Sequence, residues 1–131
     1  MKRFMKACGF LSKRVYSALS ILPEDFCKKV CEIRLRAGKP LSVVTFDGSM
    51  YITSTGRLTG LLDASLFTVT KADVKESFNR LCEYSVYSHS NDIASGFITV
   101  AGGHRAGVYG TAVYSGGKIT GMRDVGGINM R

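Results

Sequence analysis

The sequence lacks any stretch of roughly 20 consecutive apolar residues, so it contains no candidate for a membrane-spanning helix. It also lacks the pattern of a secretory signal, because Lys6, Lys13 and Arg14 interrupt the apolar N-terminal run and no small-residue cleavage site follows. A length of 131 residues excludes a large multidomain enzyme. We therefore expect a cytoplasmic protein whose four cysteines are reduced thiols.

Acidic residues are scarce, and the basic excess is uneven. The chain has 18 Lys and Arg against 10 Asp and Glu, for a net charge of +8. Residues 1–39 carry almost all of this excess, whereas residues 40–131 are nearly balanced. An electrostatic partner should therefore meet the N-terminal part. The sequence has no tryptophan and no nucleic-acid recognition motif, so nucleic acid is a disfavoured partner.

The N-terminal quarter has the periodicity of helices. Apolar residues recur every three or four positions over residues 3–22, which predicts one amphipathic helix with a basic polar face. A second, short helix should begin at Pro23 and end near Cys31. We interpret residues 1–31 as a basic helical segment and residues 32–131 as an α+β domain that forms a single compact unit with these helices.

Strands are predicted on both sides of one longer helix. Alternation from Glu32 predicts a strand, and Asp47-Gly48 predicts a hairpin turn between strands at 41–46 and 50–53. Thr70 and Asp73 then form a capping box for a helix that should run to about residue 83.

The last third is rich in glycine, and its pattern predicts a meander of β-strands. A shorter helical stretch should end near Gly96, followed by strands at 97–101, 104–114 and 119–124. Because helices and strands do not alternate one for one, we expect an α+β fold with a mixed or antiparallel sheet.

Two segments are candidates for binding an anion. Gly102-Gly103-His104-Arg105-Ala106-Gly107 places bare backbone beside a cation, although a glycine hairpin with a solvated arginine explains the same residues. Arg34 and Arg36 point to one side of a strand, where guanidinium groups bind phosphate or carboxylate with two hydrogen bonds. A solvated strand face is an equal alternative for this pair.

Other kinds of site are disfavoured. Ser115-Gly116-Gly117-Lys118-Ile119 lacks the first glycine of a phosphate loop, and its last residue is not the serine or threonine that binds magnesium. Cys27 and Cys31 lie one helical turn apart, but no paired motif supplies two further metal ligands. For His89 and His104 the sequence identifies neither a nucleophile nor an orienting carboxylate. We expect no metal site and no catalytic residue in this chain.

Four segments together resemble the N-terminal half of the stage III sporulation protein AA family. They are Glu32–Leu41 (EIRLRAGKPL), Gly96–Thr99 (GFIT), Gly102–Gly107 (GGHRAG) and Ile128–Arg131 (INMR), and their order and spacing match from about Leu11 onward. That family is similar to the ATPases of type II and type IV secretion systems. The resemblance implies an N-terminal α+β domain, with the RecA-like ATPase domain and its phosphate loop lying beyond Arg131.

The resemblance also implies partners for the parent protein. The parent would bind ATP and Mg²⁺, form a hexameric ring and act at the cytoplasmic face of the mother-cell membrane, beside the channel to the forespore. This chain alone should bind no cofactor and should not hydrolyse ATP. Its partners would be its own ATPase domain, neighbouring subunits and the membrane proteins of the sporulation channel.

In the related secretion ATPases, arginines of this domain reach the nucleotide of a neighbouring subunit. The resemblance therefore suggests the following roles: Arg105, Arg123 and Arg131 for nucleotide contact in trans, Arg34, Arg36 and His104 for an interface or anion contact, and Gly102, Gly103 and Gly107 for the glycine turn. The function implied is an assembly and coupling domain of a sporulation-specific secretion-type ATPase. The alternative is a stand-alone adaptor that binds a membrane or partner through the basic N-terminal helix.

Overall fold

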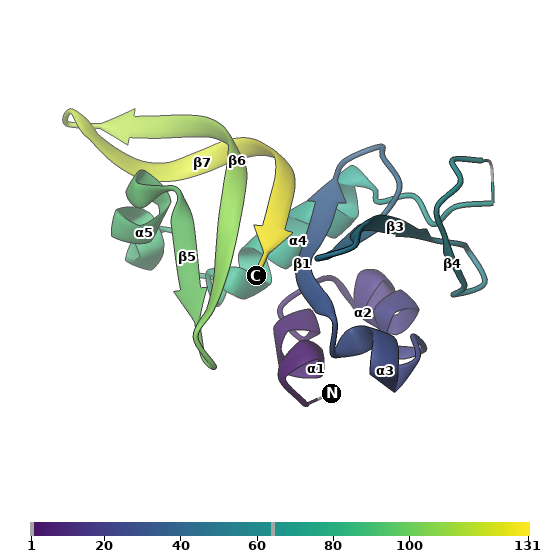
Figure 1. Cartoon of the computed structure of the whole chain (residues 1–131). Coiled ribbons are helices and arrows are strands. Elements are labelled where there is room, and N and C mark those ends of the chain that lie inside the picture. The colour runs from purple at the N-terminus through teal and green to yellow at the C-terminus, as the bar shows by residue number, and fades with distance from the viewer. Residues whose placement is uncertain (1, 64) are drawn as a thin grey trace.

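The computed structural model describes residues 2–63 and 65–131 (Figure 1), with no side-chain description for Lys2. The helices are α1 (Lys2–Cys8), α2 (Lys13–Ser20), α3 (Glu24–Cys27), α4 (Lys71–Leu81), the 3-10 helix η1 (Tyr87–His89) and α5 (Ser90–Ser95). The strands are β1 (Val30–Arg36), β2 (Ser42–Thr45), β3 (Gly48–Ile52), β4 (Leu58–Thr59), β5 (Phe97–Val100), β6 (His104–Ser115) and β7 (Lys118–Met130).

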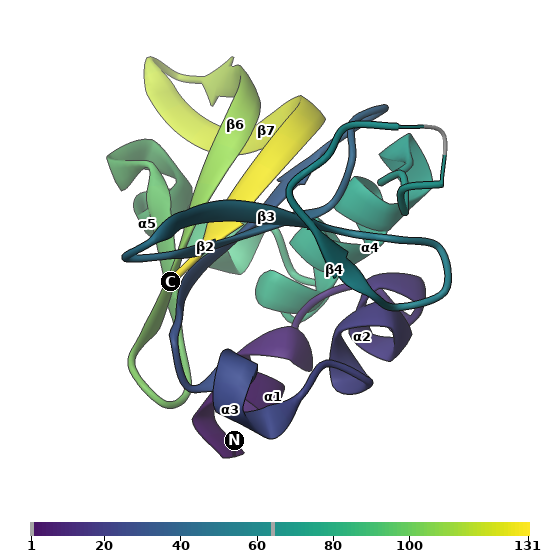
Figure 2. The same ribbon diagram turned by 45° about the vertical axis from the view of Figure 1, so that its right-hand side comes forward.

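Within the described residues, seven strands form one antiparallel sheet in the order β4-β3-β2-β1-β7-β6-β5. Figures 1 and 2 show α4 crossing behind the central strands, with α1, α2 and α3 gathered at the end where β1 begins. This arrangement confirms the predicted α+β class and gives the sheet as antiparallel. It leaves the other face of the central strands without a helical cover.

The predicted single helix over residues 3–22 is wrong, because the chain turns between α1 and α2. Ser12 caps α2: its hydroxyl oxygen accepts a hydrogen bond from the Val15 N–H (3.2 Å). The Ser12 hydroxyl also donates to the Asp73 carboxylate (3.0 Å), and the Ser12 N–H donates to the Ser77 hydroxyl (2.8 Å). Both partners lie on α4, so residues far along the chain stabilise a break that local periodicity does not show.

Several predicted boundaries also shift. The short second helix ends at Cys27 rather than near Cys31, and β1 begins at Val30 rather than Glu32. The last strand continues beyond Asp124 to Met130. Asp124 has a left-handed φ of +52°; beyond it β7 resumes its pairing with β6 and also pairs with β1. The two-residue strand β4 was not predicted.

The cap prediction is confirmed, and the predicted hairpin turn lies one residue earlier, at Phe46-Asp47. Thr70 and Asp73 form the expected capping box at the start of α4, which ends at Leu81, two residues earlier than predicted. Gly48, the first residue of β3, has a φ of +124°, and Gly96 ends α5 with a φ of +89°. Both φ values lie in the region that glycine adopts most readily.

The apolar sides of α1 and α2 lie inside the domain. Cys8, Leu11, Val15 and Leu19 are fully buried in the core formed with the sheet. The predicted apolar stripe is therefore present, but it packs against this domain and is not available to a bilayer or a partner. None of the described helices is long and apolar enough to cross a membrane.

Candidate functional site

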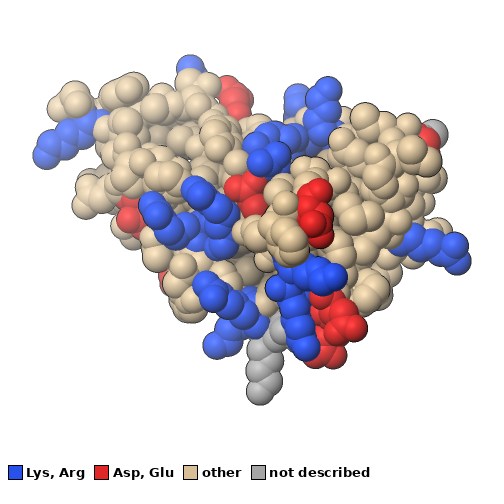
Figure 3. Space-filling view, in the orientation of Figure 1, with Lys and Arg blue, Asp and Glu red and all other residues tan. Residues whose placement is uncertain are grey.

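The uncovered face of the central strands carries a row of arginines. We call it the arginine face and define it by Glu32, Arg34, Arg36, Phe97, Arg105, Tyr109, Asn129 and Arg131. Strand register brings these residues to one side, because Arg34 pairs with Asn129, Asn129 with Gly107, and Gly107 with Phe97. Figure 3 shows basic side chains gathered over the middle of the molecule from this side, with few acidic ones between them.

Arg34 and Arg36 lie on this face as predicted, but both guanidinium groups already interact with other groups of the protein. Glu32 forms an ion pair with Arg34 and a longer one with Arg131 (3.8 Å). The Arg36 guanidinium donates to the carbonyl oxygens of Leu35 (2.9 Å) and Ile128 (3.4 Å). The structure therefore does not present them as a free pair of anion-binding groups.

A glycine allows Arg36 to lie flat across β7. A Cβ atom at Gly127 would stand 2.9 Å from the Arg36 Cδ, closer than side chains pack. The Arg36 guanidinium carbon lies 5.1 Å from the centre of the Tyr109 ring, within range of a cation–π contact. The space at Gly127 and the contact with the Tyr109 ring therefore position the Arg36 side chain against the sheet.

Arg105 is the arginine of this face whose donors are free. Its guanidinium carbon lies 4.5 Å from the centre of the Phe97 ring, and that of Arg131 lies 6.0 Å from the same ring. The side chain is exposed, and among the described residues it has no hydrogen-bond acceptor or carboxylate partner. Its five N–H groups are thus available to an anion that approaches the sheet.

The backbone fixes Arg105 beside Arg131. The Arg105 N–H donates to the Arg131 carbonyl (3.0 Å), and the Arg131 N–H donates to the Arg105 carbonyl (2.8 Å). The structure therefore brings together two of the three arginines suggested for nucleotide contact.

The third, Arg123, lies elsewhere. It pairs with Thr111 in the far part of the β6–β7 ribbon, separated from Arg131 by about 25 Å of extended chain. There it lines a separate hollow with Lys71 and Lys75 of α4. Arg123 therefore belongs to a different surface from the arginine face.

The glycine turn leaves space for a buried histidine side chain. Gly102 and Gly103 form the turn before β6 with φ values of +92° and +79°, whereas Gly107 lies within β6 and is not part of the turn. A Cβ at Gly102 would stand 3.2 Å from the His104 Cδ2, so glycine leaves room for the ring. His104 is only 4% exposed, and its Nε2 is buried without a hydrogen-bond partner.

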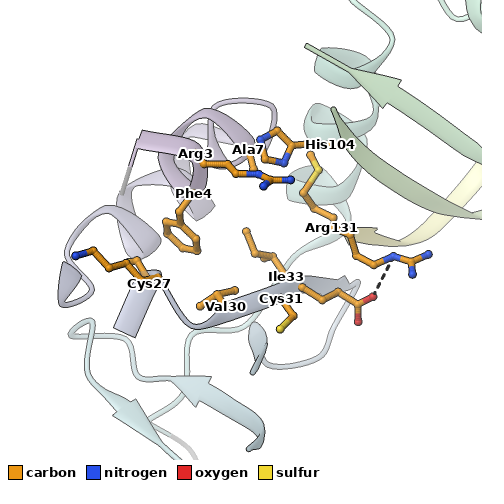
Figure 4. Close-up of a pocket in the computed structure, with 12 residues that line it drawn as sticks. Arg3, Phe4, Ala7, Cys27, Val30, Cys31, Ile33, His104 and Arg131 are labelled. Carbon is orange, nitrogen blue, oxygen red and sulfur yellow. Dashed lines mark ion pairs between the residues drawn. The ribbon is translucent and has the colours of Figure 1, made fainter. Parts of the chain in front are cut away.

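His104 lines a hollow of about 450 Å³ beside the arginine face. We call it the N-terminal hollow; its lining residues are Arg3, Phe4, Ala7, Cys27, Lys28, Val30, Cys31, Glu32, Ile33, His104, Met130 and Arg131. Figure 4 shows Arg3 and His104 at its upper side, Phe4 at the left and Val30 and Ile33 below, with Arg131 paired to Glu32 at the right. The hollow is thus formed by segments from both ends of the chain.

The cysteines are free thiols. Cys8, Cys27 and Cys82 are buried, and Cys31 is exposed on the rim of the N-terminal hollow. Burial raises the pKa of Cys8 to about 12 and that of Cys82 to about 11, and it also raises the pKa of Cys27. These three thiols are therefore protonated, unreactive core residues at neutral pH.

The sequence did not lead us to predict the aromatic residues of the arginine face or the N-terminal basic residues of the hollow. Phe97 and Tyr109 share a face with Arg105 because strand residues alternate, so the spacing of Arg105 and Tyr109 carried a usable signal. Arg3 and Lys28 had no such signal. Their position depends on how α1 and the end of α3 pack against the sheet.

The sequence belongs to a known family. The family model described as "Sporulation stage III, protein AA" matches residues 4–131, so the chain is a member, which confirms the predicted resemblance. It is 27% identical over 121 residues to "Stage III sporulation protein AA" of Bacillus subtilis (strain 168). The match covers 92% of this chain and 35% of that protein, so the chain spans about a third of its relative's length. No solved structure matches it, and the likeness to secretion-ATPase domains stays a prediction.

Proposed function

We propose that this chain is the N-terminal assembly and coupling domain of a sporulation-specific secretion-type ATPase at the channel between mother cell and forespore. The observation that carries the proposal is the Arg105 guanidinium, which is exposed and has no hydrogen-bond acceptor or carboxylate partner among the described residues, on a backbone paired with that of Arg131. Family membership supports the sporulation context. Two thirds of the relative's length lies outside the match, which is enough for a further domain.

In this proposal Arg105 acts on the nucleotide of a neighbouring subunit. An arginine supplied across an interface stabilises negative charge on a transferring phosphoryl group, an effect worth about three or more powers of ten in rate. The Phe97 ring and the backbone pairing with Arg131 hold Arg105 in position before the phosphate arrives, which lowers the ordering cost. Arg131, whose guanidinium forms a 3.8 Å ion pair with Glu32, is the second contact.

ATP and Mg²⁺ would be bound by the ATPase domain of the parent and not by this chain. The parent would assemble as a hexameric ring at the cytoplasmic face of the mother-cell membrane. Its partners would be neighbouring subunits and the membrane proteins of the channel. The adaptor alternative would have to use the exposed basic side of the N-terminal helices, because their apolar side is buried in the core.

The proposal is tested by Arg105→Ala in the full-length parent. We expect ATP binding to be retained and steady-state hydrolysis to fall by about 10³-fold or more, since the arginine acts on the transition state. Arg57→Ala is the matched control: Arg57 is an exposed arginine close to the edge strand β4, away from the arginine face, and hydrolysis should be unchanged. Unchanged hydrolysis in Arg105→Ala would sink the proposal.

A further inference from the structure

The N-terminal hollow combines an apolar floor with a cationic rim. Phe4, Ile33 and Met130 are buried residues of the floor. Arg3 and Lys28 are exposed on the rim, and among the described residues neither has a carboxylate within ion-pair distance. Unpaired cations above an apolar surface favour a molecule that has a negative group and an apolar body.

Among the described residues that line the hollow, Glu32 is the one carboxylate, and it is already engaged. It forms ion pairs with Arg34 on the arginine face and with Arg131 on the rim. Its single negative charge offsets only part of the charge of these two arginines, and it forms no ion pair with Arg3 or Lys28. An anion that enters the hollow would meet a net positive rim.

His104 is the second, independent sign of a ligand. The ring is 4% exposed, and its buried Nε2 has no partner in the protein. Buried polar atoms in proteins are nearly always hydrogen-bonded, so an orphan of this kind calls for an explanation. Figure 4 shows the ring at the side of the hollow where Arg3 lies, so a ligand with oxygen atoms would bring acceptors to the imidazole and the guanidinium together.

The volume of the hollow favours an organic anion over a bare ion as its ligand. Its volume of about 450 Å³ lies within the roughly 300–1,000 Å³ of small-molecule sites and far exceeds the roughly 30 Å³ that one water occupies in the liquid. An inorganic ion would leave most of this volume empty. A ring or a short aliphatic chain attached to the anionic group would fill more of it.

We propose that the N-terminal hollow binds an organic anion, in which a carboxylate or phosphate group contacts Arg3 and His104, Lys28 adds positive charge at the rim, and an apolar body lies against the floor. The contacts proposed here, Arg3, Lys28 and His104, differ from the nucleotide contact proposed for Arg105, although Glu32 and Arg131 border both surfaces. It is tested on the 131-residue chain without ATP, so the two proposals stand or fall independently.

The test is calorimetric titration with four probes: phenyl phosphate, phenylacetate, inorganic phosphate and benzyl alcohol. We expect at least one of the two aromatic anions to bind with a Kd of about 1 mM or lower. Inorganic phosphate and benzyl alcohol should bind at least about tenfold more weakly, since the first lacks an apolar body and the second lacks a negative charge. Binding by phenyl phosphate alone or phenylacetate alone identifies the anionic group, and both outcomes support the proposal.

Variants locate the binding. The double variant Arg3→Gln/Lys28→Gln should weaken the aromatic anion by about tenfold or more, and the bound anion should shift the His104 ring signals in the NMR spectrum of the unaltered protein. Arg57→Gln/Lys118→Gln is the control, because it removes two exposed cations outside the hollow. Absence of binding by both aromatic anions, equal binding of benzyl alcohol or inorganic phosphate, or equal loss in the two double variants would overturn the proposal.

Discussion

Asp73 shows how one buried side chain joins distant parts of the chain. Its carboxylate accepts hydrogen bonds from the Ser12 hydroxyl (3.0 Å), the Thr70 N–H and hydroxyl (2.9 Å each) and the Arg14 guanidinium (2.6 Å). Burial opposes ionisation, but these bonds and the Arg14 charge outweigh it and hold the pKa of Asp73 below its usual value. The caps of α2 and α4 thus share one ionised group.

We predict that Asp73→Asn lowers the free energy of unfolding by about 2–3 kcal/mol at pH 7, since it removes charge-assisted bonds from a buried group. The ionised carboxylate stabilises the fold above its unfolded pKa of about 3.9, and this contribution is lost as pH falls through the lower folded pKa. The difference between variant and unaltered protein should therefore shrink between about pH 5 and pH 2. Urea unfolding followed by circular dichroism measures both.

Asp47→Asn is the control for this prediction, because Asp47 is exposed in the β2–β3 turn. Its effect should stay within about 0.5 kcal/mol at pH 7. A difference for Asp73→Asn that stays constant with pH would contradict the role of its ionised form.

Gly102 and Gly103 form a matched pair for the His104 site. Both have left-handed φ values, so alanine at either should destabilise the fold by about 1 kcal/mol. A Cβ at Gly102 would also crowd the His104 ring, whereas nothing lies within 4 Å of one at Gly103. We predict that Gly102→Ala shifts the NMR signals of the His104 ring and that Gly103→Ala leaves them in place. Equal shifts in both variants would show that the contact does not hold the ring.

At the scale of elements, much of the fold follows from local signals. The capping box at Thr70, the hairpin between β2 and β3 and the alternation in β1 each depend on neighbouring residues, and each was predicted, with the hairpin turn displaced by one residue. The break between α1 and α2 was not predicted, because it depends on hydrogen bonds from Ser12 to α4. The extension of β7 past Asp124 likewise depends on pairing with β1.

The N-terminal helices are part of the core, and a single substitution tests this. Leu19 of α2 is fully buried, whereas Ile21, just beyond the helix, is 61% exposed. We predict that Leu19→Ala costs about 2–5 kcal/mol in the free energy of unfolding and that Ile21→Ala costs much less. Denaturant unfolding gives both values. Equal effects would mean that α2 does not pack on this domain.

At the scale of the whole molecule, the sheet separates two kinds of surface. Helices and core occupy one side, and the arginine face occupies the other, with the N-terminal hollow at the end where β1 begins. The family resemblance suggested Arg105, Arg123 and Arg131 as one group of contacts. The structure places Arg105 beside Arg131 and Arg123 away from both, because proximity in sequence carries no information on the register of the long β6–β7 ribbon. The hollow could not be predicted from the sequence because four separate segments form it.

The central claim is that Arg105 acts across a subunit interface, and subunit mixing tests it most directly. Full-length Arg105→Ala protein is mixed with a full-length variant whose phosphate-loop lysine is replaced, each being inactive alone. Because an intact Arg105 and an intact phosphate loop then meet at some interfaces, we predict that equal mixing restores hydrolysis at roughly a quarter of them. A mixture no more active than its separate components would contradict the account.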